Sequence, residues 1–551
     1  MENSEYFKKL IKIHEDLLLF LDDDEEKEEE KYRNFIKDLK DHCNNRKVIL
    51  FLLSKIVKNR HRSSTFINKI EKIILDISDI LKSNYENNIL FEIFKRNKII
   101  LALLIKHKII TINYFNYLKF KEEKKEDYLL YLFPEFKDFY SRKEYKKIKE
   151  KIYLMEGIDI EDKKDRETFE EKRLKGENGH YICELIRNDY IDEFVSYMTR
   201  TNINPSSKIK PSIFETNSFL IKSESTLIEY AAFYGAIMIF NYLRMSGAEL
   251  TPKLPIYAIH SNNAELIHII EELNFEKEVN YEINCINESI KCHHLEIANY
   301  FINKVFYGGL VDYSTSIKSL NFAYFPTKLP INDDTVYKIC KYDLFELIKP
   351  DFLDFLKDEN NEMKKDIFKC VTVLNNTDVI NFCIENLSII KKTDYFTSFA
   401  SCPSLLKIEI PSSYESISDN MFRPFKYVRE IVIPSSVTSI GKGAFMNLGF
   451  LKTVKFESSS SLESIGDAAF NNCVSLESIS IPSTVESIGE YAFYNCKSLK
   501  EITIPPHVTM ILERTFENCT SLTIVRVPST AKYVDWFAFS NCISLDKIED
   551  C

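Results

Sequence analysis

The sequence is poor in the residues and motifs on which most catalytic centres depend. Glycine accounts for only 12 of 551 residues, so the flexible loops that most active sites require are few. The nucleophile pattern G-x-S-x-G, the zinc-protease pattern H-E-x-x-H and the phosphate-binding P-loop are absent from the whole sequence. We therefore predict a protein that is not an enzyme, with no catalytic residue, cofactor or metal. An enzyme hidden in residues 1–175 is kept as an alternative.

Two short segments resemble parts of known sites, but each has a simpler explanation. Gly441-Lys442-Gly443 opens like a nucleotide-binding loop, yet Met446 occupies the position of the third glycine, and we interpret the segment as a turn within a repeat. His293-His294 falls between two predicted helices, without a pattern of carboxylates or cysteines around it. We expect both histidine side chains to be exposed.

Long hydrophobic runs are missing as well. No stretch reaches the roughly 18 consecutive apolar residues of a membrane-spanning helix. The apolar run at residues 17–21 is shorter than the apolar region of a signal peptide, and acidic residues follow it directly. The sequence predicts no membrane span and a cytoplasmic location.

Positive charge is not in excess. Lys and Arg number 73 against 83 Asp and Glu, which gives a formal net charge of -10. Proteins that bind nucleic acid usually show the opposite balance, because neutralising phosphates supplies much of their affinity. We interpret the basic run at residues 58–62 as a solvated helix end, and we predict that nucleic acid is not a partner.

The remaining composition is that of a folded protein with several structural regions. Apolar residues make up 45% and charged residues 28% of the chain. The 13 cysteines are scattered without a C-x-x-C pair, which predicts reduced thiols rather than disulfides. We expect packed helices in residues 1–175, helix pairs in 176–394 and β-rich repeats in 395–551. The predicted fold class is a repeat solenoid, α+β overall, in which all-α helical repeats precede a β-rich array.

Helix pairs recur through residues 176–394. The clearest unit runs from Thr226 to Leu243, where Ala231 and Ala232 let one helix pack closely on the next and Gly235 ends it. Weaker copies lie near residues 257–267, 289–298, 342–347 and 376–382. These units resemble ankyrin repeats, although their spacing is irregular and Thr-Leu-Ile-Glu at 226–229 replaces the usual Thr-Pro-Leu-His opening. Through segments 186–189, 212–217 and 228–233, the chain also resembles an ankyrin-related domain of unknown function from large families of parasitic protists. That resemblance implies no activity.

Phenylalanine returns at a nearly constant spacing in the last third of the chain. The positions are Phe399, Phe422, Phe445, Phe470, Phe493, Phe516 and Phe539, and the same step recurs throughout, except that the one from Phe445 to Phe470 is longer by two. This is the period of stacked repeats of the form L-x-x-I-x-I-P-x-x-V-x-x-I-G-x-x-A-F-x-x-C. The period-two pair Ile479 and Ile481 predicts a strand with one buried face, which Pro482 ends. A second short extended stretch reaches Ile488.

Further apolar columns repeat with the same step and predict one continuous core. One column contains Ile408, Ile431, Val454, Ile479, Ile502, Val525 and Ile548. Another contains Cys402, Phe425, Leu448, Cys473, Cys496, Cys519 and Cys542. Because Phe and Leu cannot bind a metal, we interpret this second column as a buried apolar position and not as a zinc site. In the last unit Asp550 stands at a core position, which predicts a polar end cap.

The array resembles the leucine-rich repeats of BspA-like surface antigens over residues 395–551. The resemblance implies a β-rich solenoid, with adhesion as a role for some members. Between the two strand positions of each unit lies a residue that should point outward, and in other leucine-rich repeats this face is concave and binds partners. The predicted binding ladder is Glu409, Val432, Lys455, Ser480, Thr503 and Arg526. Ordinary solvated strand residues are the alternative interpretation.

The repeats lead to a prediction of function. Stacked repeats form an extended surface, so we predict a non-enzymatic scaffold that binds protein partners. The alternative is a surface antigen or adhesin that binds a host or matrix protein, and it depends on the resemblance alone. The identity of the partner and the oligomeric state are not predicted.

Overall fold

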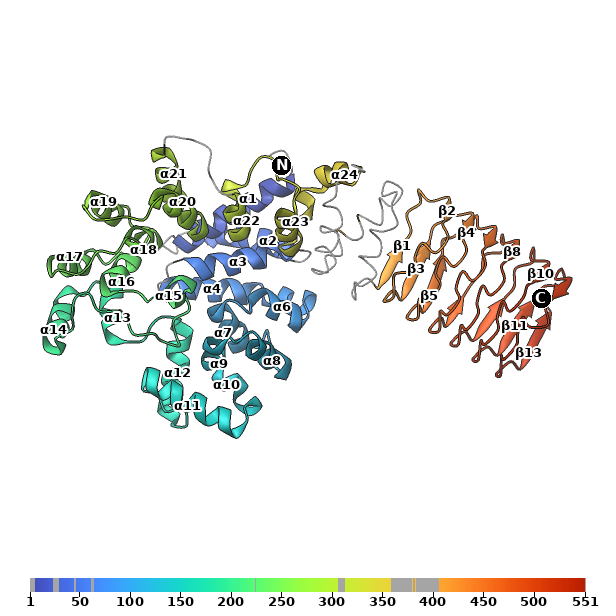
Figure 1. Cartoon of the computed structure of the whole chain (residues 1–551), viewed down its shortest axis with the longest axis horizontal. Coiled ribbons are helices and arrows are strands. Elements are labelled where there is room, and N and C mark those ends of the chain that lie inside the picture. Colours follow the sequence, from blue (N-terminus) through green and yellow to red (C-terminus); the bar gives the residue numbers. More distant parts are fainter. Residues whose placement is uncertain are drawn as a thin grey trace. The chain divides into compact units, whose positions relative to one another are not determined.

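The chain folds into helices followed by a parallel β-array. The computed structural model describes residues 5–22, 29–43, 46–60, 64–222, 224–305, 313–357, 379, 382 and 406–550. Within them, helices with defined bounds extend to residue 357 and strands begin at residue 407 (Figure 1). Contacts divide the chain into two compact units, Met1–Leu329 and Pro330–Cys551. The predicted fold class is confirmed. No described helix is both long and apolar enough to cross a membrane.

The helices from the start of the chain to Lys175 are held together by apolar faces. In α1 (Glu5–Asp22), Leu10, Ile13 and Leu17 are buried on one side at helical spacing. The other helices of this stretch are α2 (Glu29–Cys43), α3 (Val48–Asn59), α4 (Ser64–Asp76), α5 (Ser78–Asn84), α6 (Asn87–Phe94), α7 (Lys98–Lys106), α8 (Tyr114–Glu122), α9 (Glu126–Tyr131), α10 (Phe133–Phe136), η1 (Lys137–Phe139), α11 (Arg142–Glu156) and α12 (Lys163–Lys175). Helix α3 buries eight of its 12 residues and α7 seven of its 9, which suits elements inside a core.

Helix pairs follow, each turning through one residue with a positive φ. The helices are α13 (Tyr181–Arg187), α14 (Ile191–Thr201), α15 (Ser218–Lys222), α16 (Leu227–Tyr234), α17 (Ile237–Met245), α18 (Leu254–His260), α19 (Ala264–Glu272), α20 (Tyr281–Cys292), α21 (Leu295–Lys304), α22 (Tyr313–Ser319) and η2 (Phe322–Tyr324). The turn residues are Asp189 (φ 50), Gly235 (φ 73), Asn262 (φ 54) and His293 (φ 58). A left-handed residue ends the first helix and redirects the chain into the second.

The pair α16 and α17 shows why this unit is the clearest in the sequence. Thr226 caps α16 by accepting a hydrogen bond from the Glu229 N–H, and the Glu229 carboxylate accepts one from the Thr226 N–H. Ala231 and Ala232 are fully buried where α16 contacts α13, α17 and α18, as the sequence predicted. The helix pairs are consistent with ankyrin-like repeats, and that resemblance stays a prediction.

Helices from both sides of residue 175 belong to the same compact unit. Helix α3 contacts α15, α20 and α22, and α1 contacts η2. The predicted boundaries near residues 175 and 394 therefore describe changes of sequence pattern, and as domain boundaries they stay predictions. Position 394 lies outside the described residues.

The second unit opens with three short helical elements before the β-array. They are α23 (Asp333–Lys341), η3 (Phe345–Leu347) and α24 (Lys349–Lys357). The Phe345 ring contacts those of Phe352 and Phe382, with centroids 5.4 and 5.2 Å apart. Of the unit predicted at residues 376–382, only positions 379 and 382 are described.

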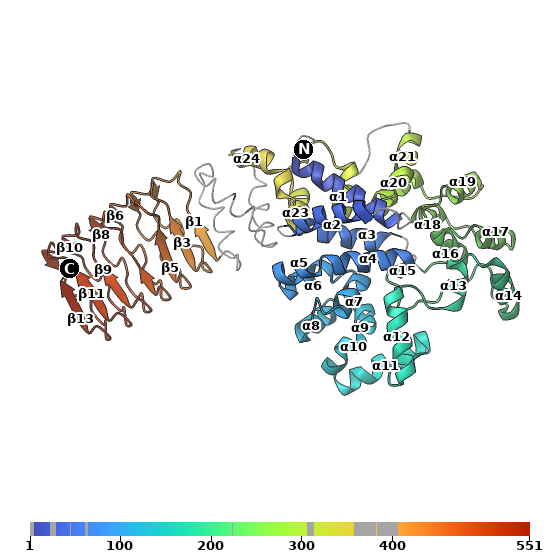
Figure 2. The ribbon, with the colours of Figure 1, turned by 180° about the vertical axis from the view of Figure 1, so that it is seen from behind.

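Each turn of the β-array contributes one strand to each of two parallel rows (Figure 2). The first row consists of β1 (Lys407–Glu409), β3 (Glu430–Ile433), β5 (Thr453–Phe456), β7 (Ser478–Ile479), β9 (Glu501–Thr503), β11 (Ile524–Val527) and β13 (Lys547–Asp550). The second consists of β2 (Ser416–Ile417), β4 (Ser439–Ile440), β6 (Ser464–Ile465), β8 (Ser487–Ile488), β10 (Met510–Ile511) and β12 (Tyr533–Val534). Hydrogen bonds join β1-β3-β5-β7 and β9-β11-β13 in the first row, and β2-β4-β6-β8 and β10-β12 in the second.

The phenylalanines of the array form one continuous stack, as the sequence predicted. From Phe422 to Phe539, successive ring centroids lie 5.1–5.4 Å apart, and the planes tilt by at most 17°. Phe399 and Cys402 lie outside the described residues. The single longer step, from Phe445 to Phe470, is absorbed between β5 and β6, because the pairings Ile431↔Val454 and Ile440↔Ile465 keep the register on both sides. The two additional residues therefore lengthen the loop between β5 and β6 and leave the strand pairing unchanged.

The last turn differs from the prediction of a polar end cap. Ile543 is 82% and Ile548 58% exposed, although Ile548 continues a column that is buried in every earlier described turn. Among the described strands, β13 pairs only with β11. Asp550 takes the place of Val527 in the register, but the last turn still exposes Ile543 and Ile548, so it is not a polar cap.

Candidate protein-binding face

The predicted binding ladder lies along the solvent side of the first strand row. Register pairs join Glu409 to Val432 and Val432 to Lys455, and Thr503 to Arg526. Ser480 follows directly after β7 and is exposed. The buried neighbour of each ladder residue anchors it, as Ile431 and Val454 do in β3 and β5. The structure therefore brings these positions into one row, while binding by this row stays a prediction.

The basic residues of the ladder form ion pairs with glutamates on neighbouring turns. Lys455 contacts Glu430 at 3.1 Å, and Arg526 contacts Glu501 at 3.2 Å and Glu549 at 3.1 Å. Side-chain exposures of 58% for Lys455 and 36% for Arg526 leave these pairs open to water, where an ion pair contributes about 0–1 kcal/mol. A partner that docked on this row would have to exchange these weak contacts for its own.

A column of asparagines, which the sequence reading did not single out, helps to hold the turns in register. Asn447, Asn472, Asn495, Asn518 and Asn541 all adopt positive φ, between 60° and 66°. The amide of Asn472 donates to Asn447 Oδ1 at 3.0 Å, and the same bond joins Asn495 to Asn472 and Asn541 to Asn518. Asn tolerates the left-handed region better than most residues and adds a side-chain bond. The recurrence of Asn two positions after each Phe from Phe445 onward was the available signal.

Of the described cysteine column, Cys473, Cys496 and Cys519 are buried, as predicted from its mixture of Cys, Phe and Leu, and Cys542 in the last turn is partly buried. Each thiol donates a hydrogen bond to the carbonyl of the Phe one turn earlier, as Cys473 does to Phe445 O at 3.3 Å. The same contact recurs at Cys496, Cys519 and Cys542, at 3.2–3.3 Å. Burial raises the pKa of the Cys473 thiol to about 12, so it stays protonated at neutral pH. These thiols fill space and support the Phe stack.

A group of half-buried and exposed aromatic residues near Arg514 is the main feature that was not predicted from the sequence. The Arg514 guanidinium lies 5.8 Å from the Tyr491 ring centroid and 5.6 Å from that of Phe537. Trp536, next to Phe537, is 94% exposed, and Phe537 is 53% exposed. We call Tyr491, Arg514, Trp536 and Phe537 the aromatic patch. Exposed Trp, Tyr and Arg are the residue types enriched where proteins bind one another most strongly.

A break in the repeat pattern could have revealed the aromatic patch. Trp536 stands in the column that holds Lys442, Asp467, Glu490 and Glu513 in the preceding turns. In the second strand row, the serines of β2, β4, β6 and β8 give way to Met510 and Tyr533, which are 52% and 50% exposed. Large apolar residues therefore replace polar ones at outward positions of the last two turns. These outward positions belong neither to the buried columns nor to the predicted ladder on the first strand row.

Two expectations are wrong for polar residues of the first compact unit, Met1–Leu329, which we call the helical unit. His293 and His294 lie at a turn between helices, as predicted, but they are only 1% and 5% exposed. His14 on α1 covers His293, with 2.8 Å between Nε2 and Nδ1. Within the basic run at 58–62, Arg60 is 3% exposed and bonds the Asp22 carboxylate and the Cys292 carbonyl. Residues 61 and 62 lie outside the described range.

The glycine segment at 441–443 is a turn within a repeat, as predicted. A side chain on Gly441 would meet the Asp419 backbone nitrogen at 2.7 Å and the Ile417 oxygen at 2.8 Å. Glycine is needed there because backbones of successive turns approach closely.

The comparisons with known proteins concern the β-array. Residues 388–470 and 450–550 match the family model described as BspA type Leucine rich repeat region, in 6 copies. No curated protein matches the chain. Leucine-rich-repeat proteins are generally protein-interaction or surface proteins, and typically they are not enzymes.

Solved structures that match are also leucine-rich repeat proteins. The T. pallidum Leucine Rich Repeat protein is 22% identical over 25% of this chain and 78% of its own, with a TM-score of 0.22. A leucine-rich repeat protein from Bacteroides ovatus is 30% identical over 26% of this chain and 45% of its own, with a TM-score of 0.23. A leucine rich cell surface protein from Faecalibacterium prausnitzii is 24% identical over 28% of this chain and 62% of its own, with a TM-score of 0.18. From the family-model match, residues 388–550 carry leucine-rich repeats of the BspA type, and the resemblance predicted from the sequence is confirmed for this region.

Proposed function

We propose that the chain is a non-enzymatic scaffold that binds other proteins through its β-array. Parallel stacking keeps outward residues of successive turns in line, which gives a partner a regular surface over several turns. The observation that carries this proposal is the aromatic patch, because exposed large apolar side chains beside an arginine are unusual on a surface of paired charges.

Of these two features of the array, we assign the aromatic patch as the anchor and the ladder as a weaker contact. Covering Trp536 and Phe537 would remove apolar area from water, at about 25 cal/mol per Å². The ladder charges already have partners, so docking on Lys455 or Arg526 would exchange one ion pair for another. We therefore assign most of the binding energy to the aromatic patch.

Affinity capture with the full-length chain tests the proposal. Proteins retained from cells that express it would be compared between the native chain, the variant W536S/F537S and the ladder variant K455S/R526S. We expect the first variant to lose a specific partner by at least about tenfold and the second by less than that. A matched control is Met245→Ser on α17, because Met245 is 77% exposed in the other compact unit.

Two outcomes would contradict the proposal. Either W536S/F537S retains the same proteins at native levels, or the native chain retains no protein that binds again when purified. Circular dichroism of each variant excludes unfolding as the cause of a loss. Surface labelling of intact cells separates the scaffold from an adhesin, because only the adhesin would be labelled.

A further inference from the structure

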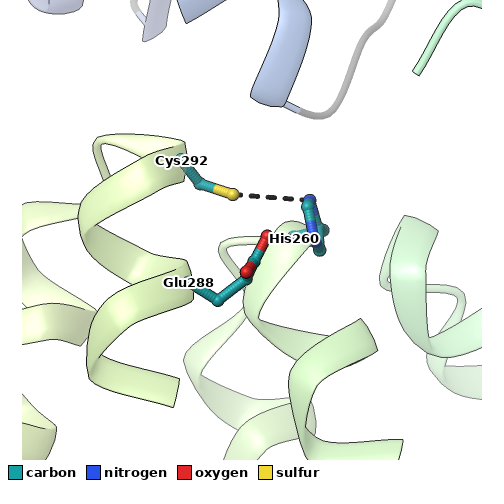
Figure 3. A group of neighbouring side chains, drawn as sticks. All are labelled: His260, Glu288 and Cys292. Atoms are coloured by element: carbon teal, nitrogen blue, oxygen red, sulfur yellow. Dashed lines mark hydrogen bonds and ion pairs between the residues drawn. The ribbon is translucent and has the colours of Figure 1, made fainter. Parts of the chain in front are cut away.

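Three buried side chains with metal-binding atoms meet in the helical unit. Glu288 and Cys292 lie one turn apart on α20, and both point toward His260 at the end of α18 (Figure 3). Cys292 Sγ is 3.4 Å from His260 Nδ1, and His260 Nε2 is 3.2 Å from Glu288 Oε1. Cys292 is 0% and His260 1% exposed, while the Glu288 side chain is 12% exposed. This burial distinguishes the group from surface carboxylates that meet by chance.

The neighbours hold these side chains in place. The His260 ring packs against the rings of Phe219 and Phe233, with centroids 4.4 and 4.7 Å away. Lys291 contacts Glu288 Oε2 at 2.7 Å and leaves Oε1 on the side of the histidine. His260 Nε2 is buried without an aligned hydrogen bond. Its polar contact is Glu288 Oε1, and a shared metal ion would hold both atoms in place.

The three side chains lie near enough to share one small cation, to which the imidazole gives one of its two ring nitrogens. Zn²⁺ binds sulfur at about 2.3 Å and nitrogen or oxygen at about 2.0–2.2 Å, which places neighbouring tetrahedral ligands about 3.3–3.6 Å apart. One ligand atom from each of the three side chains already lies within 4.8 Å of the others. Sulfur, imidazole and carboxylate together favour zinc over magnesium or calcium, which take oxygen ligands. We propose that His260, Glu288 and Cys292 bind a single Zn²⁺ ion.

A cavity beside Glu288 offers a route for the ion. It has a volume of about 430 Å³, and Glu288, Asn284, Asn287, Lys291 and Thr315 contribute to its wall. Three protein ligands leave the fourth tetrahedral position for water or for a group that enters from this cavity. The bound ion joins α18 to α20, so it stabilises the packing of two neighbouring helix pairs. This role is separate from the partner surface on the β-array.

Metal titration of the full-length chain tests the proposal. The chain is stripped with a chelator and titrated with Zn²⁺ against a chromophoric competitor, and then with Co²⁺. We expect one equivalent of Zn²⁺ to bind and to raise the thermal unfolding midpoint. Co²⁺ should give a sulfur-to-cobalt charge-transfer band in the native chain and in Glu288→Gln, with at least tenfold weaker binding in Glu288→Gln. Cys292→Ser should lose the band.

Cys285→Ser is the matched control, because Cys285 is also buried on α20 but does not belong to the three-residue group. It should bind both metals as the native chain does. The proposal is wrong if the stripped native chain binds no equivalent of Zn²⁺ or if the cobalt band survives in Cys292→Ser. If Cys292→Ser does not fold, unchanged Zn²⁺ affinity in Glu288→Gln would also overturn it.

Discussion

The asparagines of the column combine a left-handed backbone with side-chain hydrogen bonds between neighbouring turns. Asn495 has φ 61, and its amide donates to Asn472 Oδ1. We expect Asn495→Ala to lower the free energy of unfolding of the array by about 2–3 kcal/mol, from the lost hydrogen bond and the strained backbone. Asn495→Gly should cost only about 1 kcal/mol, because it keeps the backbone unstrained. Hydrogen exchange of array peptides in the full chain measures both. Equal losses would contradict the backbone part of this explanation.

The pair His14 and His293 should make the helical unit sensitive to acid. Burial, followed by the charge of Arg60, lowers the pKa of His14 to about 3, and burial lowers that of His293 well below its usual value. The unfolded histidine binds a proton below about pH 6.5 while the folded one stays neutral, so stability falls as the pH falls from 6.5. For His14, the loss by pH 4.5 is about 2–3 kcal/mol.

Substitution of His14 by glutamine tests this dependence. Gln cannot titrate, so the decline in unfolding free energy between pH 7 and 4.5 should be smaller by about 2–3 kcal/mol. Denaturant unfolding followed by far-ultraviolet circular dichroism, a signal dominated by helices, gives the decline. His268→Gln serves as control, because its side chain is 58% exposed. A decline that is unchanged in His14→Gln would show that other groups cause the acid sensitivity.

Burial of single residues could be predicted only where the sequence repeats. Phe470 and Cys473 each stand in a column of similar residues, and a column that excludes polar residues indicates the core. His293 and Arg60 have no such column. Their burial depends on residues far away in the sequence, such as His14, and on helices whose packing no local pattern specifies. The sequence therefore predicted exposure for both, and wrongly.

The strands of the array stack so closely that some turns exclude any side chain. A Cβ on Gly466 would lie 2.8 Å from the Gly441 carbonyl carbon and 2.9 Å from the Ile440 oxygen. Both are backbone atoms that cannot move without breaking the pairing of β4 with β6. We expect Gly466→Ala to cost about 1–3 kcal/mol or more.

Gly449 provides the comparison for Gly466→Ala. A Cβ there would meet only Val474 Cγ2, at 3.9 Å, so Gly449→Ala should change stability by less than about 1 kcal/mol. Hydrogen exchange of peptides from β4 and β6 would show faster opening in Gly466→Ala only. If both variants opened alike, close approach of the backbones would not be the reason for glycine at position 466.

The strand order was predictable because period two marks one buried face and a constant step aligns every turn. The predicted ladder accordingly lies in one row. The helices were predictable as elements but not in their packing, since α3 lies against α20, with the sixteen α-helices α4 to α19 between them in the chain. The proposed zinc ligands His260 and Glu288 lie on two different helices, α18 and α20, so no motif with a fixed spacing in the sequence could predict them.

The two compact units differ in which polar and aromatic side chains they bury and which they expose. The helical unit buries titratable groups such as His14, His260 and Cys292. The array exposes paired charges and the aromatic patch instead. We therefore expect acid and metal to alter the first unit, whereas ring-removing substitutions such as Trp536→Ser alter what the second one binds.

The repeated phenylalanine stack would allow the β-array to gain or lose whole turns. Phe470, Phe493 and Phe516 meet nearly identical neighbours, so loss or duplication of a whole turn would leave each surviving ring in the environment it had before. The array can therefore act as a ruler whose length changes in increments of about 4.8 Å, the spacing of paired strands. An insertion or deletion shorter than a whole turn has to fall in a loop to keep the strand pairing, as the two additional residues between β5 and β6 do.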